Sequence, residues 1–267
     1  MTLETHPLGQ TGLEVSRLGL GTVKFGRNQE VRYPNSFVLP SDQEIIDLLE
    51  LAHSLGINLL DTAPAYGSSE QRIGRLLSNR ADWVICTKVG EEFLHGKSFF
   101  DFSADHVHYS IERSLHNLNT DYLDIVLIHS DGNDMHILES TGCLNALLSL
   151  KRQGVVRAVG MSTKTVEGGM KAAEIGDVVM VTYNPSSKED HTVIDLTMEL
   201  EKGVFVKKVL NSGHDCIGAE TNSTNNLRFA LDHQGVTSVI VGTINANHLK
   251  ANATAVKSLE VCENTAP

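Results

Sequence analysis

The sequence predicts a (β/α)8 barrel, or TIM barrel, formed as a single domain over residues 1–267. Eight apolar segments rich in Val, Ile and Leu alternate with amphipathic helix patterns, and apolar runs without strict alternation are typical of strands buried on both faces. Eight strand–helix units in roughly 250 residues fit this barrel. The rival is an open doubly wound sheet, whose G-x-G-x-x-G signature is not supplied by "GLGTVKFG" after the first strand.

The expected strands follow one another along the whole chain. In order they are "LGLGT" (18–22), "NLLDTA" (58–63), "WVICTKVG" (83–90), "YLDIVLIHS" (122–130), "VRAVGMST" (156–163), "VVMVTYN" (178–184), "VFVKKVL" (204–210) and "SVIVGT" (238–243). Residues 8–20 are expected to form a small N-terminal β-hairpin that closes the bottom of the barrel. Residues 23–40 and 90–102 are expected to be long loops.

Helix patterns with start and stop signals lie between these strands. Ser41 with Glu44, and Ser68 with Gln71, have the spacing of a capping box. Val107, Ile111, Leu115 and Leu118 share one helix face, as do Leu249, Ala253 and Val256. A glycine closes five helix patterns just before a strand, where a left-handed residue commonly ends a helix: Gly56, Gly154, Gly176, Gly203 and Gly235.

Composition narrows the class of protein. The formal net charge of −11 argues against nucleic acid as a partner, because binding phosphate backbones needs clustered Lys and Arg. The chain has neither an apolar run of the roughly 20 residues that a membrane helix needs nor a signal-peptide pattern at its start. A cytoplasmic protein is therefore expected. The cysteines form no C-x-x-C pair and are interpreted as reduced thiols, with Cys86 and Cys143 in the core.

Polar residues gather where the expected strands end. Asp61 ends the second strand, Lys88 the third and His129 the fourth, while Tyr66 lies just beyond Asp61. Each has an ordinary structural explanation when taken alone, as a helix cap, a half-buried aromatic, a solvated lysine or a core histidine. Three successive strands that place ionisable groups at the same end favour an active site, because barrels of this kind carry theirs at the carboxyl ends of the strands.

These four groups suit proton delivery. A cationic Lys88 near Tyr66 would lower the phenol's pKa from about 10 toward neutrality, making it a general acid for a carbonyl oxygen. His129 could donate a hydrogen bond to the same oxygen. The set supplies a proton but no electron pair, so a hydride donor such as a nicotinamide cofactor is the missing component.

The sequence resembles a short, bacterial-type aldo-keto reductase nearly end to end. The resemblance is carried by "LGQTGLEVSRLGLGTVKFG", "GINLLDTAPAYGSSEQRIGRLL", "TDYLDIVLIHS", "RAVGMST" and "SVIVGTINANHLKAN". It implies that Asp61, Tyr66, Lys88 and His129 are the catalytic tetrad and that Tyr66 is the proton donor. It also implies a small carbonyl or alcohol substrate and an NADP(H) cofactor, with NAD possible.

The resemblance also assigns cofactor-binding residues. Gly21, Thr22 and Asp61 would line the nicotinamide end, and Ser162 would bind the carboxamide. Lys208, Leu210 and Ser212 match the pyrophosphate segment. The adenosine and 2′-phosphate region would comprise Gly242, Thr243, His248 and Asn252.

Several positions depart from the family pattern. Met180 replaces the usual glutamine at the carboxamide, and Lys207 replaces the aromatic that stacks on the nicotinamide. His248 stands where an arginine usually grips the 2′-phosphate, and a neutral imidazole is a weak substitute for a guanidinium. NAD or dual cofactor use is therefore an alternative to NADP, with Lys250 or a loop lysine as a possible replacement.

Two other functions compete with the oxidoreductase. One alternative is a regulatory subunit that binds the cofactor but has little turnover. Subunits of this kind resemble the family and keep its catalytic tetrad. A metal-dependent hydrolase is disfavoured because the strand ends lack metal-ligand spacing, and His106 and His108, two residues apart, do not share a helix face. No metal is expected at the active site.

Overall fold

The computed structural model describes residues 2–216 and 220–263, without the side chains at 215, 216, 220–222, 262 and 263. The side chains of Cys216 and Cys262 therefore lie outside the described residues. Cys86 and Cys143 are free and buried, as predicted. No helix in the described ranges is long and apolar enough to cross a membrane.

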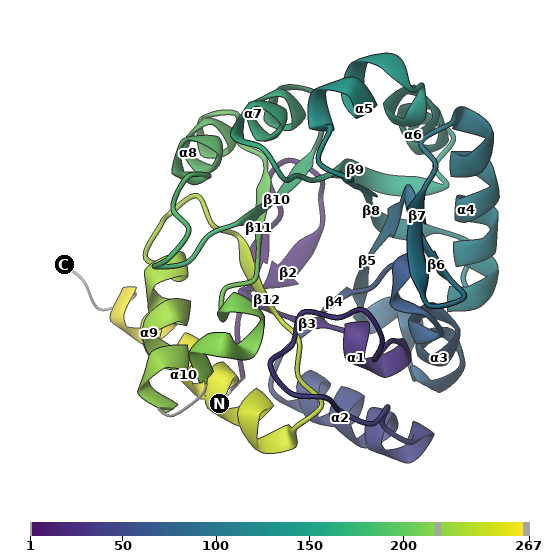
Figure 1. Ribbon diagram of the computed structural model, residues 1–267. Coiled ribbons are helices and arrows are strands. Elements are labelled where there is room, and N and C mark those ends of the chain that lie inside the picture. The colour runs from purple at the N-terminus through teal and green to yellow at the C-terminus, as the bar shows by residue number, and fades with distance from the viewer. Residues whose placement is uncertain (1, 217–219, 264–267) are drawn as a thin grey trace.

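Eight parallel strands close into a barrel, which confirms the predicted fold (Figure 1). They are β3 (Leu18–Gly21), β4 (Leu59–Asp61), β5 (Val84–Val89), β8 (Leu123–His129), β9 (Val156–Ser162), β10 (Val178–Thr182), β11 (Gly203–Lys207) and β12 (Ser238–Val241). The register pairs Gly21 with Asp61, and His129 with Ser162. The polar residues that end these strands therefore meet at one rim.

Helices surround the barrel. They are α1 (Val23–Gly26), α2 (Asp42–Ser54), α3 (Ser69–Leu76), α4 (Ala104–Leu118), α5 (Asp134–Ser140), α6 (Cys143–Arg152), α7 (Val166–Ile175), α8 (His191–Glu199), α9 (Glu220–Leu231) and α10 (Ala246–Glu263), with short 3-10 turns η1 (Pro64–Tyr66), η2 (Arg80–Asp82) and η3 (Asn211–Cys216). The apolar faces predicted for α4 and α10 pack on the core between helices and strands.

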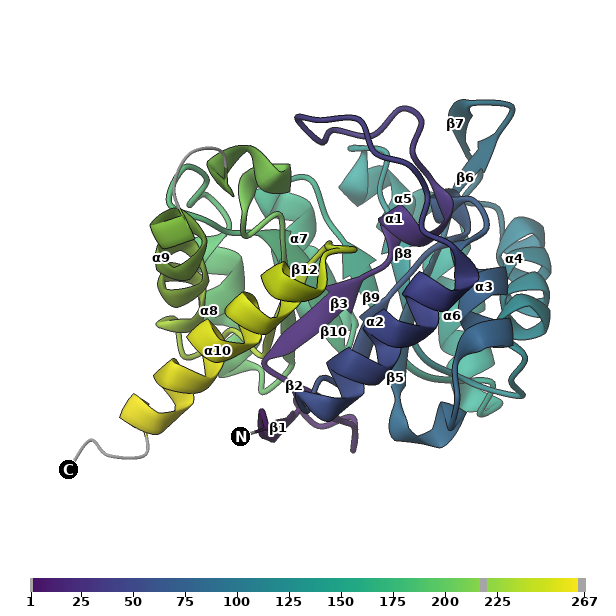
Figure 2. The same ribbon diagram turned by 90° about the horizontal axis from the view of Figure 1, so that it is seen from below.

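The N-terminal hairpin is present, with β1 (Thr5–Pro7) pairing antiparallel to β2 (Glu14–Ser16). Its predicted range of 8–20 is shifted, because residues 18–21 belong to the first barrel strand. Leu8 and Val15 are fully buried in the cluster that fills the barrel interior. Leu8 packs at Gly203, the first residue of β11, so the hairpin closes the end opposite the rim of polar residues (Figure 2).

The expected loop at 90–102 is instead a second hairpin, with β6 (Glu91–Leu94) paired to β7 (Lys97–Phe100). Its two-residue turn is His95-Gly96, and both residues have positive φ, 51° and 77°. Such turns match the twist of paired strands and favour glycine. The expected loop at 23–40 begins with the short helix α1, and its remainder projects from the same side of the barrel as the second hairpin (Figure 2).

The helix-capping predictions are only partly correct. Ser41 and Glu44 form both bonds of the capping box. Ser68 precedes α3 but makes no capping bond, because its backbone (φ −85°, ψ 11°) lacks the extended conformation of a side-chain cap. Left-handed φ is found at Gly56 and Gly154. It is not found at the other three predicted glycines, Gly176, Gly203 and Gly235, so that prediction was wrong for them.

Candidate active site

A buried lysine connects three of the four predicted catalytic residues. Lys88 Nζ donates to Asp61 Oδ1 at 2.5 Å, to the Thr62 carbonyl at 2.9 Å and to Tyr66 Oη at 3.1 Å. Tyr66 Oη in turn lies 3.3 Å from Asp61 Oδ2. Strands β4 and β5 are neighbours, and η1 turns the chain back so that Tyr66 faces both. The three side chains therefore form one hydrogen-bonded unit.

Burial makes the ion pair between Lys88 and Asp61 strong. The Lys88 side chain is 1% exposed and the Asp61 side chain 7% exposed. Burial lowers the pKa of Lys88, but the adjacent Asp61 charge outweighs it and raises the pKa above its ordinary value. The lysine is therefore an ammonium at every pH at which the protein would work.

The pKa of Tyr66 moves in the direction opposite to the sequence prediction. Burial and the Asp61 carboxylate raise it, and together they outweigh the lowering effect of Lys88. The predicted lowering considers the charge of Lys88 alone, whereas Asp61 already neutralises that charge. Tyr66 is consequently a protonated phenol, whose hydrogen bond from Lys88 can stabilise negative charge when the proton leaves.

His129 completes the predicted set from the end of β8. Its ring meets the Tyr66 ring edge-on, with centroids 6.2 Å apart. Its Nδ1 lies 3.0 Å from Glu91 Oε2, close but not aligned as a hydrogen bond. Burial lowers the pKa of His129, with Glu91 opposing the shift. The neutral ring beside a carboxylate favours a proton on Nδ1 and a lone pair on Nε2.

Glu91 is a residue of this site that the sequence argument missed. Burial disfavours its charge, yet contacts with His129, Ser98 and Arg27 lower its pKa to about 2. Ser98 in β7 donates to Glu91 at 2.7 Å, and Arg27 lies 3.7 Å from it. Glu91 is the first residue of the hairpin at 91–100, a segment that was expected to be a loop. The dipeptide His95-Gly96 was the sequence signal that could have predicted the hairpin turn.

A cavity of about 960 Å³ opens at this rim. It is lined by all four predicted catalytic residues and by most of the predicted cofactor residues: Gly21, Ser162, Lys208, Leu210, Ser212, Gly242, Thr243, His248 and Asn252. Thr22, which is itself described, does not line it. The Thr22 hydroxyl donates to the Asp61 carbonyl at 2.9 Å and contacts Ser69 Oγ at 2.8 Å, so it braces the end of β4.

One wall of the cavity fits a carboxamide. Ser162 Oγ accepts from Lys207 Nζ at 2.8 Å and keeps its own proton available. Thr163 Oγ1 is buried with no hydrogen-bond partner in the structure, although Thr163 also lines the cavity. Buried polar groups normally have a partner, so this orphaned hydroxyl suits a polar ligand. Met180 lies beside them and offers only a thioether.

Lys207 is a second lysine in this cavity, half-buried at the end of β11. Besides Ser162, it donates to the Thr163 carbonyl at 2.6 Å. Burial, together with the charge of Lys208, lowers the pKa of Lys207 to about 7. The lysine that replaces an aromatic in the family pattern is thus a titrating group rather than a permanent charge.

A cationic part of the cavity fits phosphate. Lys208, Arg32 and Lys164 all line it, and burial with the charges of the other two lowers the pKa of Lys208. The chain here holds Lys208, Asn211 and Ser212 at left-handed φ of 56°, 46° and 55°. Such conformations cluster at ligand sites, and an anion would relieve the repulsion among the three cations. Arg32 and Lys164 come from separate loops and were not predicted from the sequence.

The adenosine region predicted from the resemblance also lines the cavity. His248 and Asn252 lie one turn apart in α10, next to Gly242 and Thr243 at the end of β12. A Cβ on Gly242 would lie 3.0 Å from Tyr33 Oη, so glycine lets the 27–41 loop approach this wall. The exposed Lys250 does not line the cavity.

Comparisons with known proteins identify the family of the chain. The model of the aldo/keto reductase family matches residues 17–214. A solved structure of a putative aldo-keto reductase from Pseudomonas aeruginosa is 49% identical, covers 97% of each chain and superposes with a TM-score of 0.88. L-Galactose dehydrogenase of Arabidopsis thaliana is 29% identical over 97% of this chain and 89% of its own length. NADH-specific methylglyoxal reductase of Escherichia coli is 27% identical over 74% of this chain and 68% of its own length.

Proposed function

The chain belongs to the aldo/keto reductase family of oxidoreductases, and from that premise we propose that it interconverts a small carbonyl compound and its alcohol with NAD(P)(H), using Tyr66 as the proton donor. The observation that carries the proposal is the contact of 3.1 Å between Lys88 Nζ and Tyr66 Oη. It places the Lys88 ammonium against Tyr66, a phenol that lines the cavity and also contacts Asp61.

The tetrad residues would divide the proton chemistry among them. In reduction, Tyr66 Oη gives its proton to the carbonyl oxygen while that oxygen gains negative charge. Lys88 stabilises the phenolate that remains, and Asp61 keeps Lys88 protonated. A raised pKa keeps Tyr66 protonated and neutral until the substrate oxygen becomes basic enough to take the proton.

His129 would orient the substrate oxygen. The Glu91 carboxylate 3.0 Å from Nδ1 favours a proton on that nitrogen, so the ring would present the Nε2 lone pair, to which the hydroxyl of an alcohol substrate can donate. This arrangement favours binding of the alcohol side of the reaction. It is consistent with a sugar dehydrogenase among the relatives.

Aldo-keto reductases use nicotinamide cofactors, which supply a hydride for reduction or accept one in the reverse direction. We assign the carboxamide to Ser162 and Thr163, and the pyrophosphate to the segment from Lys208 to Ser212 with Arg32 and Lys164 nearby. His248 in place of arginine supports use of both NAD and NADP rather than a strong NADP preference. An NADH-specific relative shows that the family includes NAD users.

Absorbance of the reduced cofactor tests the proposal. The protein is assayed with NAD⁺ and NADP⁺ on a panel of aldose sugars and simple alcohols, and with NADH and NADPH on aldehydes and 2-oxoaldehydes. At least one substrate in each direction should turn over. Tight cofactor binding with no turnover on either panel would instead support the regulatory subunit and contradict the proposal.

A further inference from the structure

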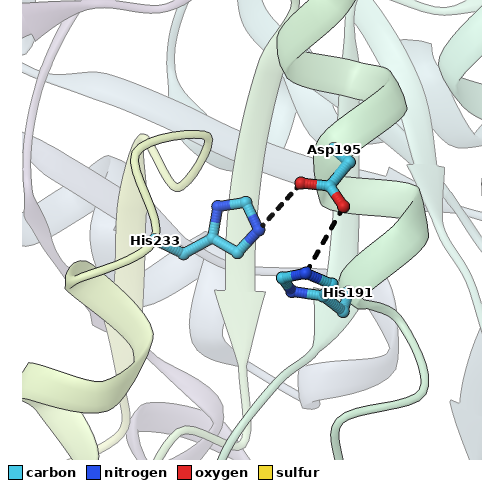
Figure 3. A group of neighbouring side chains, drawn as sticks. All are labelled: His191, Asp195 and His233. Carbon is cyan, nitrogen blue, oxygen red and sulfur yellow. Dashed lines mark ion pairs between the residues drawn. The ribbon is translucent and has the colours of Figure 1, made fainter.

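Two histidines and an aspartate converge on the outside of the barrel, away from the cavity. His191 and Asp195 lie one turn apart in α8, and His233 follows α9 (Figure 3). His191 Nε2 is 3.4 Å from Asp195 Oδ2, and His233 Nε2 is 3.3 Å from Asp195 Oδ1. None of the three residues lines the active-site cavity.

The spacing of these atoms matches the needs of a zinc ion. Two ligand atoms about 2.1 Å from a tetrahedral zinc ion are about 3.4 Å apart. Each histidine Nε2 lies at close to that distance from one oxygen of Asp195, His191 from Oδ2 and His233 from Oδ1. One candidate ligand atom from each residue lies within 4.8 Å of the others. The His191 side chain is 54% exposed, so it has room to rotate and close the remaining gap. Two imidazoles and one carboxylate are a common zinc donor set, which leaves a fourth position for water.

An aromatic ring contacts both histidines, and the buried His233 is the more restricted of the two. Tyr183 stacks near-parallel to His191 at 6.1 Å and meets His233 edge-on at 5.9 Å. Phe229 also contacts the Tyr183 ring, with the two ring centroids 4.9 Å apart. An aromatic wall of this kind reduces the loss of side-chain freedom when the rings bind an ion.

His233 supplies an independent indication of a ligand. Its side chain is only 9% exposed, and Nε2 is buried without a hydrogen-bond partner of good geometry, although it points toward Asp195. The Gly235 N–H donates to His233 Nδ1 at 3.2 Å, which leaves the ring proton on Nε2. When Nε2 binds a metal ion, the ring proton moves to Nδ1, and Nδ1 can no longer accept from the Gly235 N–H. The zinc affinity should therefore be lower than at a site where Nδ1–H donates to an acceptor.

We propose that His191, Asp195 and His233 form a zinc-binding site that connects α8 to the segment between α9 and β12. Such a site is separate from the proposed oxidoreductase chemistry. It would act as a cross-link in the outer helix layer, where Asp190 at the start of α8 already accepts from the Thr182 backbone N–H at 3.0 Å.

Zinc titration of the metal-stripped full chain tests the site. The protein is treated with a chelator and desalted, and binding of ZnCl₂ is followed by calorimetry and by the rise in melting temperature. Co²⁺ is used in parallel, because tetrahedral Co²⁺ absorbs strongly in the visible. We expect one equivalent of Zn²⁺ to bind with a rise in melting temperature and tetrahedral Co²⁺ bands.

Matched variants show which residues bind the ion. H233N keeps an acceptor for Gly235 while removing Nε2, and D195N removes the carboxylate charge; each should weaken zinc binding by at least about tenfold. H53Q is the control, because His53 Nε2 lies 3.7 Å from the single carboxylate of Asp82. Wild-type affinity in both H233N and D195N, or an equal loss in H53Q, would overturn the proposal. If H233N or D195N fails to fold, zinc binding is measured with H191Q, which removes the third proposed ligand and should also weaken it.

Discussion

The ammonium of Lys88 lies 3.1 Å from the hydroxyl of Tyr66, in a position that also places it 2.5 Å from a carboxylate oxygen. The lysine therefore serves two purposes. It neutralises the Asp61 carboxylate inside the barrel, and it donates a hydrogen bond to the Tyr66 hydroxyl. Under the proposed function, stability and proton transfer would therefore depend on the same side chain.

Lys88→Met should destabilise the protein and impair turnover together. Removing one partner of a buried ion pair leaves Asp61 charged and unpaired, which costs about 3–5 kcal/mol of unfolding free energy. Urea denaturation measures this cost. The double variant Lys88→Met/Asp61→Asn is the control and should recover part of the stability but little of the activity. A single variant as stable as the wild type would contradict the pairing.

The rate of carbonyl reduction should stay nearly constant as the pH rises from about 7 to about 9. Because burial and Asp61 raise the pKa of Tyr66, its acidic form persists across that range. The measurement is kcat at saturating substrate and cofactor, made in the Lys207→Met background so that the titration of Lys207 does not contribute. A fall of kcat to half its maximum near pH 7 as the pH rises would instead support the lowered pKa of Tyr66 expected from the sequence.

Lys207 should make binding of the oxidised cofactor depend on pH. Its pKa of about 7 means that it is an ammonium below that pH and an uncharged amine above it. An ammonium beside the carboxamide site repels a positively charged nicotinamide, so affinity for NAD⁺ should rise by up to about tenfold between pH 6 and 8. Fluorescence titration measures this change, and Lys207→Met should abolish it. An unchanged pH dependence in the variant would exclude Lys207 as the cause.

His248→Arg should increase the preference for NADPH over NADH by at least about tenfold, because a guanidinium can bind a phosphate bidentately and an imidazole cannot. The wild type is expected to bind the two cofactors with dissociation constants within about tenfold of each other. Competitive fluorescence titration gives both constants. Lys250→Arg is the control, since Lys250 does not line the cavity. A wild-type preference near a hundredfold would contradict this interpretation of His248.

The sequence predicted the barrel and the four-residue set because their signals are local. Each strand is a short apolar run, and Asp61, Lys88 and His129 stand at or beside the carboxyl end of one. Once the barrel closes, its register brings those ends together without further information. The family resemblance then named the same residues.

Other features depend on contacts between distant segments. Glu91 reaches His129 only because a His-Gly turn folds residues 91–100 into a hairpin. The pKa of Tyr66 follows from the sum of burial, Asp61 and Lys88, and the sequence shows the signs of the charges but not their balance. His233 lies far along the chain from Asp195, so their meeting on the outer helix layer carries no sequence signature.

Tyr66→Phe tests the central claim most directly. This change removes the hydroxyl while keeping the ring, and reductive kcat should fall by about 100-fold to 10,000-fold with little change in the cofactor dissociation constant. Tyr33→Phe is the matched control, because Tyr33 also lines the cavity. The ammonium beside its ring is that of Lys24, 4.2 Å from the ring centroid, and not that of Lys88. It should retain most of the activity. Full activity of Tyr66→Phe on every carbonyl that the wild type reduces would contradict the account.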